Sequence, residues 1–446
     1  MFSAVSQAQE KAGAREQDET PRFVFGSYGR VRAASDLAGH SGRSTNIVSH
    51  GTRYDLGNYA ELELRREENP AELELRIVAT VATAGDFFHY DATFEDAFAV
   101  RNLFAEVRGA FVPGLTLWAG SRMVRGDDIY LLDFWPLDNL NLIGGGTSYE
   151  EGPIQLKLHA GLARPDDPFY LQRVEVPPPR GFEPVTLDLL DRPRAVAALK
   201  GTWWPLGRAT ARGMKLIGYG EGHHLPSGVR EVDVDSLESL PSASGTAIVL
   251  QLGGYWDDPA AFSNLFLRCS FGLAAYDPLA GPELIGRLPP TDDASACQVG
   301  LSANLEYGPV ALQAGAYYRR SRDPSANVRT GGLMDEGVID VRPQVYFGQR
   351  AGLAFDASYQ ALEARTLDEA TGEAVGGSVT KLALIPFYSP HGRGSYTRPH
   401  LQLTYALSLR DERAQRLYPE ADRRSRSSHE HFLAIGAEWW FDSSSY

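Results

Sequence analysis

A strict two-residue alternation of side chains is the feature that most constrains how this chain can fold. It is clearest in residues 401–410 (LQLTYALSLR), where leucine or tyrosine occupies every odd position and a polar or small residue, or Arg410, every even one. The same alternation returns in residues 154–162 (IQLKLHAGL), with Lys157 and His159 in mid-strand on the polar face. A period of two residues indicates a β-strand with two different faces. The sequence therefore predicts an all-β fold.

Charged residues also alternate along a predicted hairpin formed by residues 59–65 and 73–81, with Asn69 and Pro70 at its turn. Its polar side carries glutamates and an arginine in mid-strand, and such charges need water beside them. No apolar run approaches the ~20 residues of a membrane-spanning helix. We expect further strands at these ranges: 247–255, 264–275, 298–306, 310–318, 338–347, 353–359, 379–388 and 430–441.

The connections between these segments are of two kinds. A tight turn such as Tyr307 to Pro309 alternates with long polar loops such as residues 277–296 and 411–429. Outer-membrane barrels have this asymmetry, with short periplasmic turns and long external loops. A soluble sandwich or propeller also alternates, but its polar faces are exposed to solvent and its loops are more uniform. The pattern favours an antiparallel transmembrane barrel.

Composition excludes several other classes of protein. The net charge of −14 argues against a nucleic-acid partner, which requires a basic footprint, and against a pore for anions. The two cysteines, Cys269 and Cys297, lack metal-site or disulfide-framework spacing, so we expect two unremarkable thiols. The pairs Asp127–Asp128 and His223–His224 stand in no catalytic or metal-ligand motif. We expect no enzymatic activity, no metal and no cofactor.

Residues 1–20 have neither a basic start nor an apolar stretch, so we expect residues 1–21 to be a leader remnant or polar tail and residues 22–446 to form the barrel. In the last predicted strand, alternation puts Phe441 and Trp439 on one face and Trp440 and Glu438 on the other. A terminal aromatic on the lipid face is typical of outer-membrane barrels, although five residues follow Phe441 here.

Residues 120–138 (GSRMVRGDDIYLLDFWPLD) resemble the segment of the maltoporins that runs from a strand into the third loop. Other blocks agree in order: FGSYGR, YDLGNYAEL, VRNLFAEVRG, SYTRPHLQL and GAEWWF. The resemblance implies a sugar porin in the outer membrane of a Gram-negative bacterium, a homotrimer of barrels with about 18 strands each. It also implies that the third loop folds into the pore.

In this family a track of aromatic rings guides sugars through the channel. The resemblance assigns that role to Tyr28, Tyr59, Trp135, Phe266 and Trp440. A neighbouring subunit's second loop contributes one more ring in the family, and Tyr90 is the best counterpart, with Phe88 and Phe94 as rivals. A further track tryptophan has no match before VRPQVYF.

The resemblance also implies a polar track beside the rings. Its members here are Arg30, Glu61, Arg101, Asp128, Tyr130 and Asp133. Two arginines of the family are displaced, because Asp55 and Gly126 stand at their places and Arg53 and Arg125 lie nearby. We therefore expect a more acidic constriction, and a pore that prefers cations.

The predicted function is facilitated diffusion of sugars of the maltose and maltodextrin type through the outer membrane, surrounded by outer-membrane lipid. The alternative is a general or differently selective porin for small hydrophilic solutes and ions, which has kept the barrel and lost the specificity.

Overall fold

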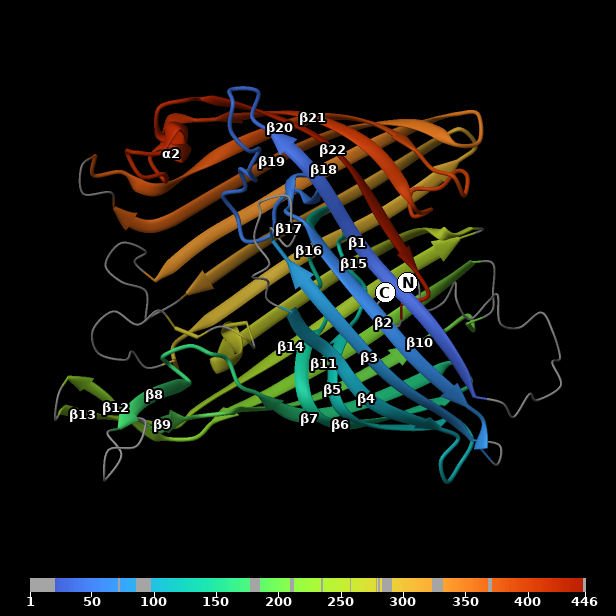
Figure 1. The fold of residues 1–446 in the computed structure, drawn as a ribbon, viewed down its shortest axis with the longest axis vertical. Coiled ribbons are helices and arrows are strands. Elements are labelled where there is room, and N and C mark those ends of the chain that lie inside the picture. Colours follow the sequence, from blue (N-terminus) through green and yellow to red (C-terminus); the bar gives the residue numbers. More distant parts are fainter. Residues whose placement is uncertain are drawn as a thin grey trace.

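The computed structural model describes residues 21–70, 73–85, 98–176, 185–208, 212–233, 236–256, 258–277, 279, 281–282, 291–322, 332–367 and 371–443. Its main element is one sheet of 18 strands. Each strand pairs antiparallel with the next, and the last pairs with the first, from Ser27 opposite Phe441 to Ser35 opposite Leu433. The sheet is therefore a closed barrel, as predicted (Figure 1).

The barrel strands follow the chain in order, interrupted only by two hairpins at the loop end. Their bounds are β1 Arg22–Ser35, β2 Tyr59–Glu68, β3 Glu74–Ala84, β4 Phe98–Arg108, β5 Leu115–Arg125, β6 Asn139–Glu151, β7 Ile154–Ala163, β10 Arg194–Trp203, β11 Arg212–Leu225, β14 Ala243–Trp256, β15 Asp258–Gly272, β16 Ser295–Tyr307, β17 Val310–Arg322, β18 Leu333–Phe347, β19 Ala351–Leu367, β20 Ala374–Tyr388, β21 His400–Arg410 and β22 His429–Phe441.

The barrel has apolar side chains on its outside and polar side chains on its inside, the reverse of a soluble protein. Leucines of neighbouring strands, among them Leu250, Leu252 and Leu265, are exposed on the outside. The alternate positions point inward and are polar, as with Gln251 and Asn264, which hydrogen-bond to each other. An apolar exterior around a polar interior is what a β-barrel in lipid requires.

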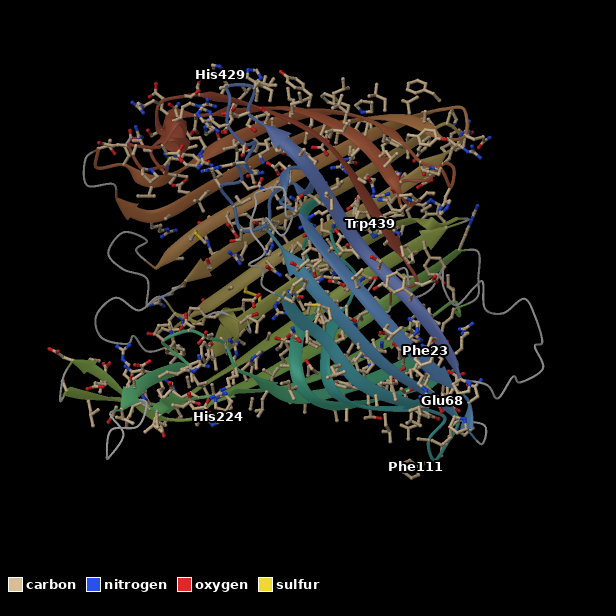
Figure 2. All side chains as sticks on the ribbon, viewed as in Figure 1. Phe23, Glu68, Phe111, His224, His429 and Trp439 are labelled. Carbon is tan, nitrogen blue, oxygen red and sulfur yellow. A yellow bond between two sulfur atoms is a disulfide. The ribbon has the colours of Figure 1, made fainter. Side chains whose placement is uncertain are left out.

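Exposed aromatic side chains mark the ends of the strands. At the short-turn end, the exposed rings include Phe23, Phe25, Tyr149, Trp203, Trp256, Tyr307, Phe347, Tyr388 and Phe441. Figure 2 labels Phe23 on β1 and Phe111 in the turn between β4 and β5. At the loop end, Phe98, Phe271 and Tyr318 are exposed. Two aromatic girdles around an apolar band indicate the two interfaces of a membrane.

The loop end carries the secondary structure outside the barrel. Two hairpins, β8 (Leu171–Val176) with β9 (Val185–Asp191) and β12 (Gly228–Asp233) with β13 (Ser236–Leu240), lie there together with α2 (Glu412–Gln415) (Figure 1). Short 3₁₀ turns occupy Arg53–Asp55, Tyr130–Leu132, Leu273–Ala275 and Arg423–Ser425. None of the helices in the described ranges has the length and apolar character to cross a membrane.

The predicted strands correspond to barrel strands, with the segment 264–275 ending earlier, at Gly272. Several barrel strands, among them β6, β10 and β11, have no counterpart in the predicted set. Their apolar signal is weak because small residues occupy many of their positions. On β11 the outward positions from 218 to 222 are all glycine. Pairing with neighbours on both sides, and not intrinsic preference, makes these segments strands.

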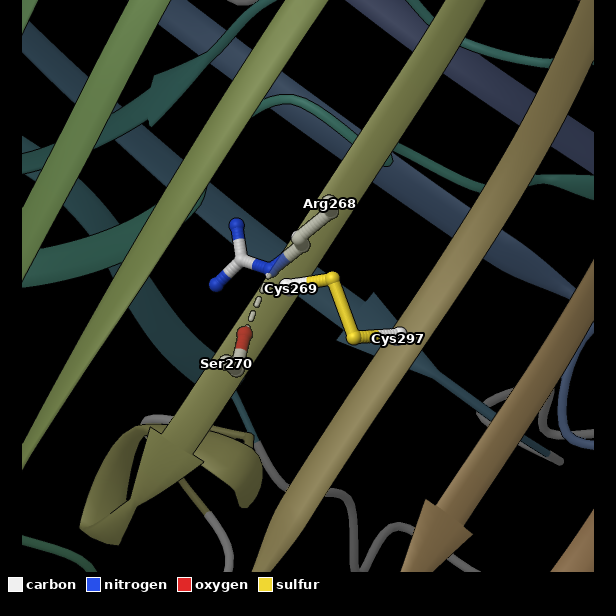
Figure 3. The surroundings of a disulfide bond; sticks show 4 residues. All are labelled: Arg268, Cys269, Ser270 and Cys297. Atoms are coloured by element: carbon white, nitrogen blue, oxygen red, sulfur yellow. Dashed lines mark hydrogen bonds between the residues drawn. A yellow bond between two sulfur atoms is a disulfide. The ribbon is translucent and has the colours of Figure 1, made fainter.

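The expectation of two free thiols is wrong. Cys269 of β15 and Cys297 of β16 face each other in the ladder, with Cα atoms 4.1 Å apart, and form a disulfide (Figure 3). The bond lies near the base of the loop that joins these strands. A spacing of 28 residues fits no known short motif, so only the register of the two strands brings the sulfurs together. Disulfides of this kind persist in oxidising compartments such as the periplasm.

We predict that a Cys269→Ser/Cys297→Ser double variant forms the same barrel but unfolds more easily. Closing a loop of 28 residues constrains the unfolded chain and contributes roughly 3 to 4 kcal/mol in the chain-entropy account. The urea midpoint for unfolding from detergent should fall accordingly. Reducing agent should lower the midpoint of the wild type and leave that of the variant unchanged. Equal midpoints for the oxidised wild type and the variant would contradict this stabilising role.

Candidate functional site

The register of three adjacent strands places the predicted rings and charges side by side. On β1, Tyr28 and Arg30 are two residues apart and share the inward face. Tyr28 lies opposite Trp440 of β22 and Glu61 of β2, and Arg30 lies opposite Glu438 and Tyr59 of the same two strands. The resulting grid alternates a ring and an ionic side chain along each strand, and across β1 and β22 it sets Tyr28 beside Trp440 and Arg30 beside Glu438.

The rings of this grid are in contact with one another. The ring centroids of Tyr28 and Tyr59 are 5.7 Å apart, and those of Tyr28 and Trp440 are 6.5 Å apart and stacked. Tyr130, from the third loop, meets Trp440 edge-on at 6.2 Å. We call Tyr28, Tyr59, Tyr130 and Trp440 the aromatic cluster. It joins strands from both ends of the sequence to the third loop.

Arginines lie over the rings of the aromatic cluster. The guanidinium carbon of Arg53 is 4.5 Å from the centroid of Tyr130 and 5.7 Å from that of Tyr28. Arg398 lies 4.0 Å from the centroid of Trp440. Arg30 and Arg101 are each 5.6 Å from that of Tyr59. Cations over ring faces are attracted by the ring quadrupole, so the cluster is built from rings and guanidinium groups together.

The carboxylates of the site are paired with these arginines. Glu438 accepts from Arg53 at 2.6 Å, from Nε of Arg398 at 3.0 Å and from the Tyr130 hydroxyl at 3.0 Å. Asp133 accepts from Arg53 at 2.7 Å and from Arg30 at 3.2 Å. Burial acts to raise the pKa of the Asp133 carboxyl, but Arg53 and Arg30 outweigh it and hold that pKa below its ordinary value. Asp133 therefore stays charged.

Glu61 and Asp128 complete the predicted polar track and differ in their surroundings. Glu61 accepts hydrogen bonds from the Tyr59 hydroxyl and from Arg101, another predicted member of the track. Asp128 is half-buried and makes no ion pair with a residue in the described ranges. Arg101 therefore neutralises Glu61, whereas Asp128 has no ion-pair partner in the described ranges.

The third loop (residues 126–138) packs across the barrel from the strands that carry it. Ile129 is fully buried and lies against Gly300 of β16 and Gly315 of β17. A Cβ added at Gly315 would lie 2.7 Å from Ile129, so glycine permits this close approach. Lys215 and Lys200 bind Asp127 and Asp138 at the two ends of the loop, the latter pair at 2.8 Å. Apolar packing and two ion pairs therefore hold the loop.

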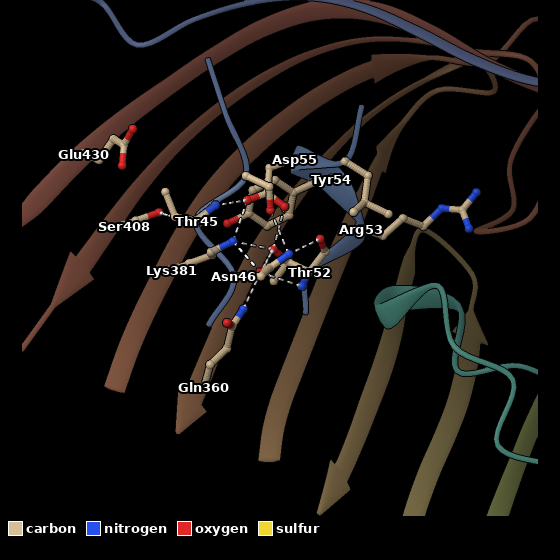
Figure 4. Close-up of polar contacts among 12 residues, drawn as sticks. Thr45, Asn46, Thr52, Arg53, Tyr54, Asp55, Gln360, Lys381, Ser408 and Glu430 are labelled. Carbon is tan, nitrogen blue, oxygen red and sulfur yellow. Dashed lines mark hydrogen bonds and ion pairs between the residues drawn. The ribbon is translucent and has the colours of Figure 1, made fainter. Parts of the chain in front are cut away.

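The first loop (residues 36–58) also contacts inward-facing wall residues. Lys381 of β20 donates to Asn46 Oδ1 at 2.6 Å and to Thr52 Oγ1 at 3.0 Å, and forms an ion pair with Asp55 (Figure 4). The ring of His50 stacks on Phe134 of the third loop at 3.9 Å. The first and third loops therefore support each other. No pattern in the sequence indicates how the first loop is anchored, because Lys381 is more than 300 positions away from Asp55.

The turn between β20 and β21 (residues 389–399) is longer than the short turns expected at this end of the barrel. Tyr396 contacts the Tyr130 ring edge-on at 5.2 Å, and Arg398 bonds to Glu438 and to the Tyr130 hydroxyl. Arg398 is a site residue that the sequence did not single out, although it lies in the block SYTRPHLQL. The third loop is thus held from the turn end as well.

The predicted aromatic residues do not all share one environment. Tyr28 is 1% exposed and Phe266 is 0% exposed, with Phe266 in the apolar cluster that includes Ile129. Tyr59, Trp135 and Trp440 are partly exposed. Trp135 lies under Arg125, whose guanidinium carbon is 3.7 Å from its ring centroid. Tyr90 lies outside the described residues, and so do its rivals.

Lysines lie beside both positions at which family arginines are displaced, and the more acidic constriction stays a prediction. Asp55 pairs with Lys381. A Cβ at Gly126 would lie 2.3 Å from Asp138 Oδ1 and 3.2 Å from Lys200 Nζ, so that space is already filled by an ion pair. Both lysines come from strands remote in the sequence.

No group of three or more metal-ligating side chains occurs among the described residues. The barrel, the aromatic cluster and its arginines agree with the comparison to protein families, in which the family model of the LamB porins matches residues 23–441. The chain belongs to the LamB porin family. It is an outer-membrane channel of the maltoporin type, selective for sugars and not an enzyme.

Other solved structures resemble this LamB porin at low sequence identity. OmpT of Vibrio cholerae is 13% identical, with 96% of this chain and 99% of that chain covered and a TM-score of 0.39. OmpF of Salmonella typhi, in complex with daunomycin, is 12% identical, with 95% and 99% covered and a TM-score of 0.42.

We predict that Arg53→Gln makes the pore more selective for cations. The substitution removes a charge that offsets Asp133 and Glu438, and the shift should be roughly twofold or more in permeability ratio in dilute salt, where screening is weak. Reversal potentials across a salt gradient measure it. Arg320→Gln is the matched control, because Arg320 lies on the outer face and pairs with Asp335. Identical selectivity in wild type and Arg53→Gln would mean that Arg53 does not face the ion path.

Proposed function

We propose that sugars pass along Tyr59, Trp440 and Trp135, with the third loop forming the narrowest part of the channel. The observation that carries this proposal is the grid on β22, β1 and β2, where rings alternate with ionic groups in register. Sugars present C–H faces and equatorial hydroxyls, so rings and charged hydrogen-bonding groups complement them on two sides. Contacts of this kind are weak enough for the solute to leave again.

The exposure of each ring refines its role. Tyr59, Trp135 and Trp440 are partly exposed and can touch a solute, whereas Tyr28 and Phe266 are buried. Tyr28 then acts as a positioning residue for Tyr59 and Trp440, and Phe266 as packing beneath the third loop. Arg30, Arg101 and Asp133 are partly exposed and supply the polar side, whereas Arg53 and Arg398 are buried and hold it in place. Asp128, without an ion pair in the described ranges, is the carboxylate with most freedom to accept from a sugar hydroxyl.

The proposal includes a homotrimer, with residues 22–446 forming the barrel of each subunit and residues 1–21 as a tail or leader remnant. A contribution of Tyr90 to the neighbouring channel remains a prediction. A barrel with an apolar exterior and two aromatic girdles supports residence in lipid, and the family is one of porins.

We predict that Trp135→Ala weakens sugar block of the ion current by about 1 to 2 kcal/mol, the range for a ring-face contact. Maltodextrins titrated into single-channel recordings measure the block. Trp203→Ala removes an exposed tryptophan of the outer girdle and serves as the control, with unchanged block. Normal folding with wild-type block in Trp135→Ala would remove Trp135 from the path. Absence of block by every oligosaccharide in the wild type would favour the general porin.

We predict that the protein extracted in detergent is a trimer that resists dissociation until heated. The apolar outer wall needs either lipid or another subunit against it. Analytical ultracentrifugation in matched-density detergent gives the mass, and unheated against heated gel electrophoresis gives the stability of the assembly. A monomer at all concentrations would contradict the trimer and leave the barrel assignment unaffected.

A further inference from the structure

The first and third loops meet through a stack of two rings. His50 of the first loop lies on Phe134 of the third loop, with the ring centroids 3.9 Å apart and the planes 13° from parallel. Phe134 is buried, and its peptide oxygen accepts from the Ile129 N–H at 2.7 Å, which fixes it within the third loop. The next residue is Trp135, a ring of the proposed sugar path. The His50–Phe134 stack therefore supports the third loop directly beside that ring.

The barrel wall also holds His50 in place. Its backbone N–H donates to the Tyr317 hydroxyl of β17 at 3.2 Å, and the Tyr317 ring meets the His50 ring edge-on at 5.7 Å. The preceding residue, Ser49, donates its backbone N–H to Glu336 of β18 at 3.0 Å. Neither ring nitrogen of His50 has a hydrogen bond to a residue in the described ranges. His50 therefore contributes the face of its ring to the contact with the third loop.

Two charged residues act on the ring of His50. Arg319 of β17 is the nearby cation, and its own partner is Glu336 at 2.6 Å. Asp133 of the third loop is the nearby carboxylate, and it is already paired with two arginines. Tyr317, the other titratable group at this ring, is an uncharged phenol near neutral pH. Burial, and after it the charge of Arg319, lower the pKa of His50 to about 4, against the opposing effect of Asp133. His50 is therefore uncharged at neutral pH.

We propose that neutral His50 is a positioning residue that holds the third loop against the first loop, and that acid releases this contact. The inference rests on the proposed role of the third loop as the narrowest part of the channel. A protonated His50 would be a half-buried charge beside Arg319, with no carboxylate of its own in the described ranges. Burying an unpaired charge is costly, so the imidazolium leaves Phe134 for water. Phe134 and Trp135 then lose the support of the first loop.

The direction of the pH effect follows from the proton affinities of the stacked and the released ring. A released His50 takes up its proton near pH 6.5, and the stacked ring does so only near pH 4. Above pH 6.5 both states are uncharged, so the stack is present in full. As the pH falls through this range, the released loop gains the proton first, and the equilibrium shifts towards release by up to about tenfold per pH unit.

Hydrogen exchange of the wild-type protein in detergent tests this contact without any sugar. Between pH 7 and pH 4.5, after correction for the intrinsic pH dependence of exchange, the amides of residues 44–52 and 126–138 should exchange at least about fivefold faster. His50→Phe keeps a ring face on Phe134 and has no group to protonate, so both loops should stay protected at pH 4.5.

His40→Gln is the matched control for this experiment. It removes the other histidine of the first loop, which is exposed and pairs with Asp36, and it should respond to acid as the wild type does. Equal protection of the wild type at both pH values, or the same acid response in His50→Phe, would contradict the role of the His50–Phe134 stack.

Sugar block of the ion current at the same two pH values connects the stack with the channel. Block by maltodextrins should be at least about fivefold weaker at pH 4.5 in the wild type and unchanged in His50→Phe. Wild-type block that does not depend on pH would overturn the positioning role of His50. If no maltodextrin blocks the wild type at pH 7 while exchange still responds to acid, the proposed sugar path fails and the acid-sensitive contact stands.

Discussion

The backbone pairing of β22 with β1 is the constraint on which the rest of this molecule depends. In hydrocarbon no water is present to satisfy peptide groups, so a sheet crossing a membrane must have no free edge. Closure by β22 and β1 meets that condition and joins the two ends of the described chain. The same pairing brings Trp440 beside Tyr28, so the step that closes the barrel also assembles the aromatic cluster.

A closed wall with an apolar outside leaves a polar inside, and the structure fills it with paired charges. Glu438 joins Arg53 of the first loop, Arg398 of the β20–β21 turn and Tyr130 of the third loop. Removing one member would leave buried charges without compensation, which is more costly than never having them. This junction explains why three segments distant in sequence take up definite positions. It also means that residues beside the proposed sugar path have structural as well as transport roles.

Some rings of the site can contact a solute, and other rings and the guanidinium groups hold them in position. Arg398 lies against Trp440, and Arg53 lies over Tyr130 and Tyr28. The rings that stay partly exposed are those whose faces or edges can meet a solute, and the buried ones keep them in place.

Period two alone determined which side chains of β2, β7, β21 and β22 face inward, because alternation is a property of the strand itself. The opposite faces of Phe441 and Trp440 and the pairing of rings with charges two residues apart follow from it. The resemblance indicated the number of barrel strands and which residues form the aromatic and polar tracks. Only the tertiary structure decided that Phe266 is buried beneath the third loop, that Cys269 bonds Cys297, and that Lys381 pairs with Asp55 and Lys200 with Asp138. Each of these features depends on contacts between residues that are remote in the chain. A local sequence pattern does not indicate which remote residue will make the contact.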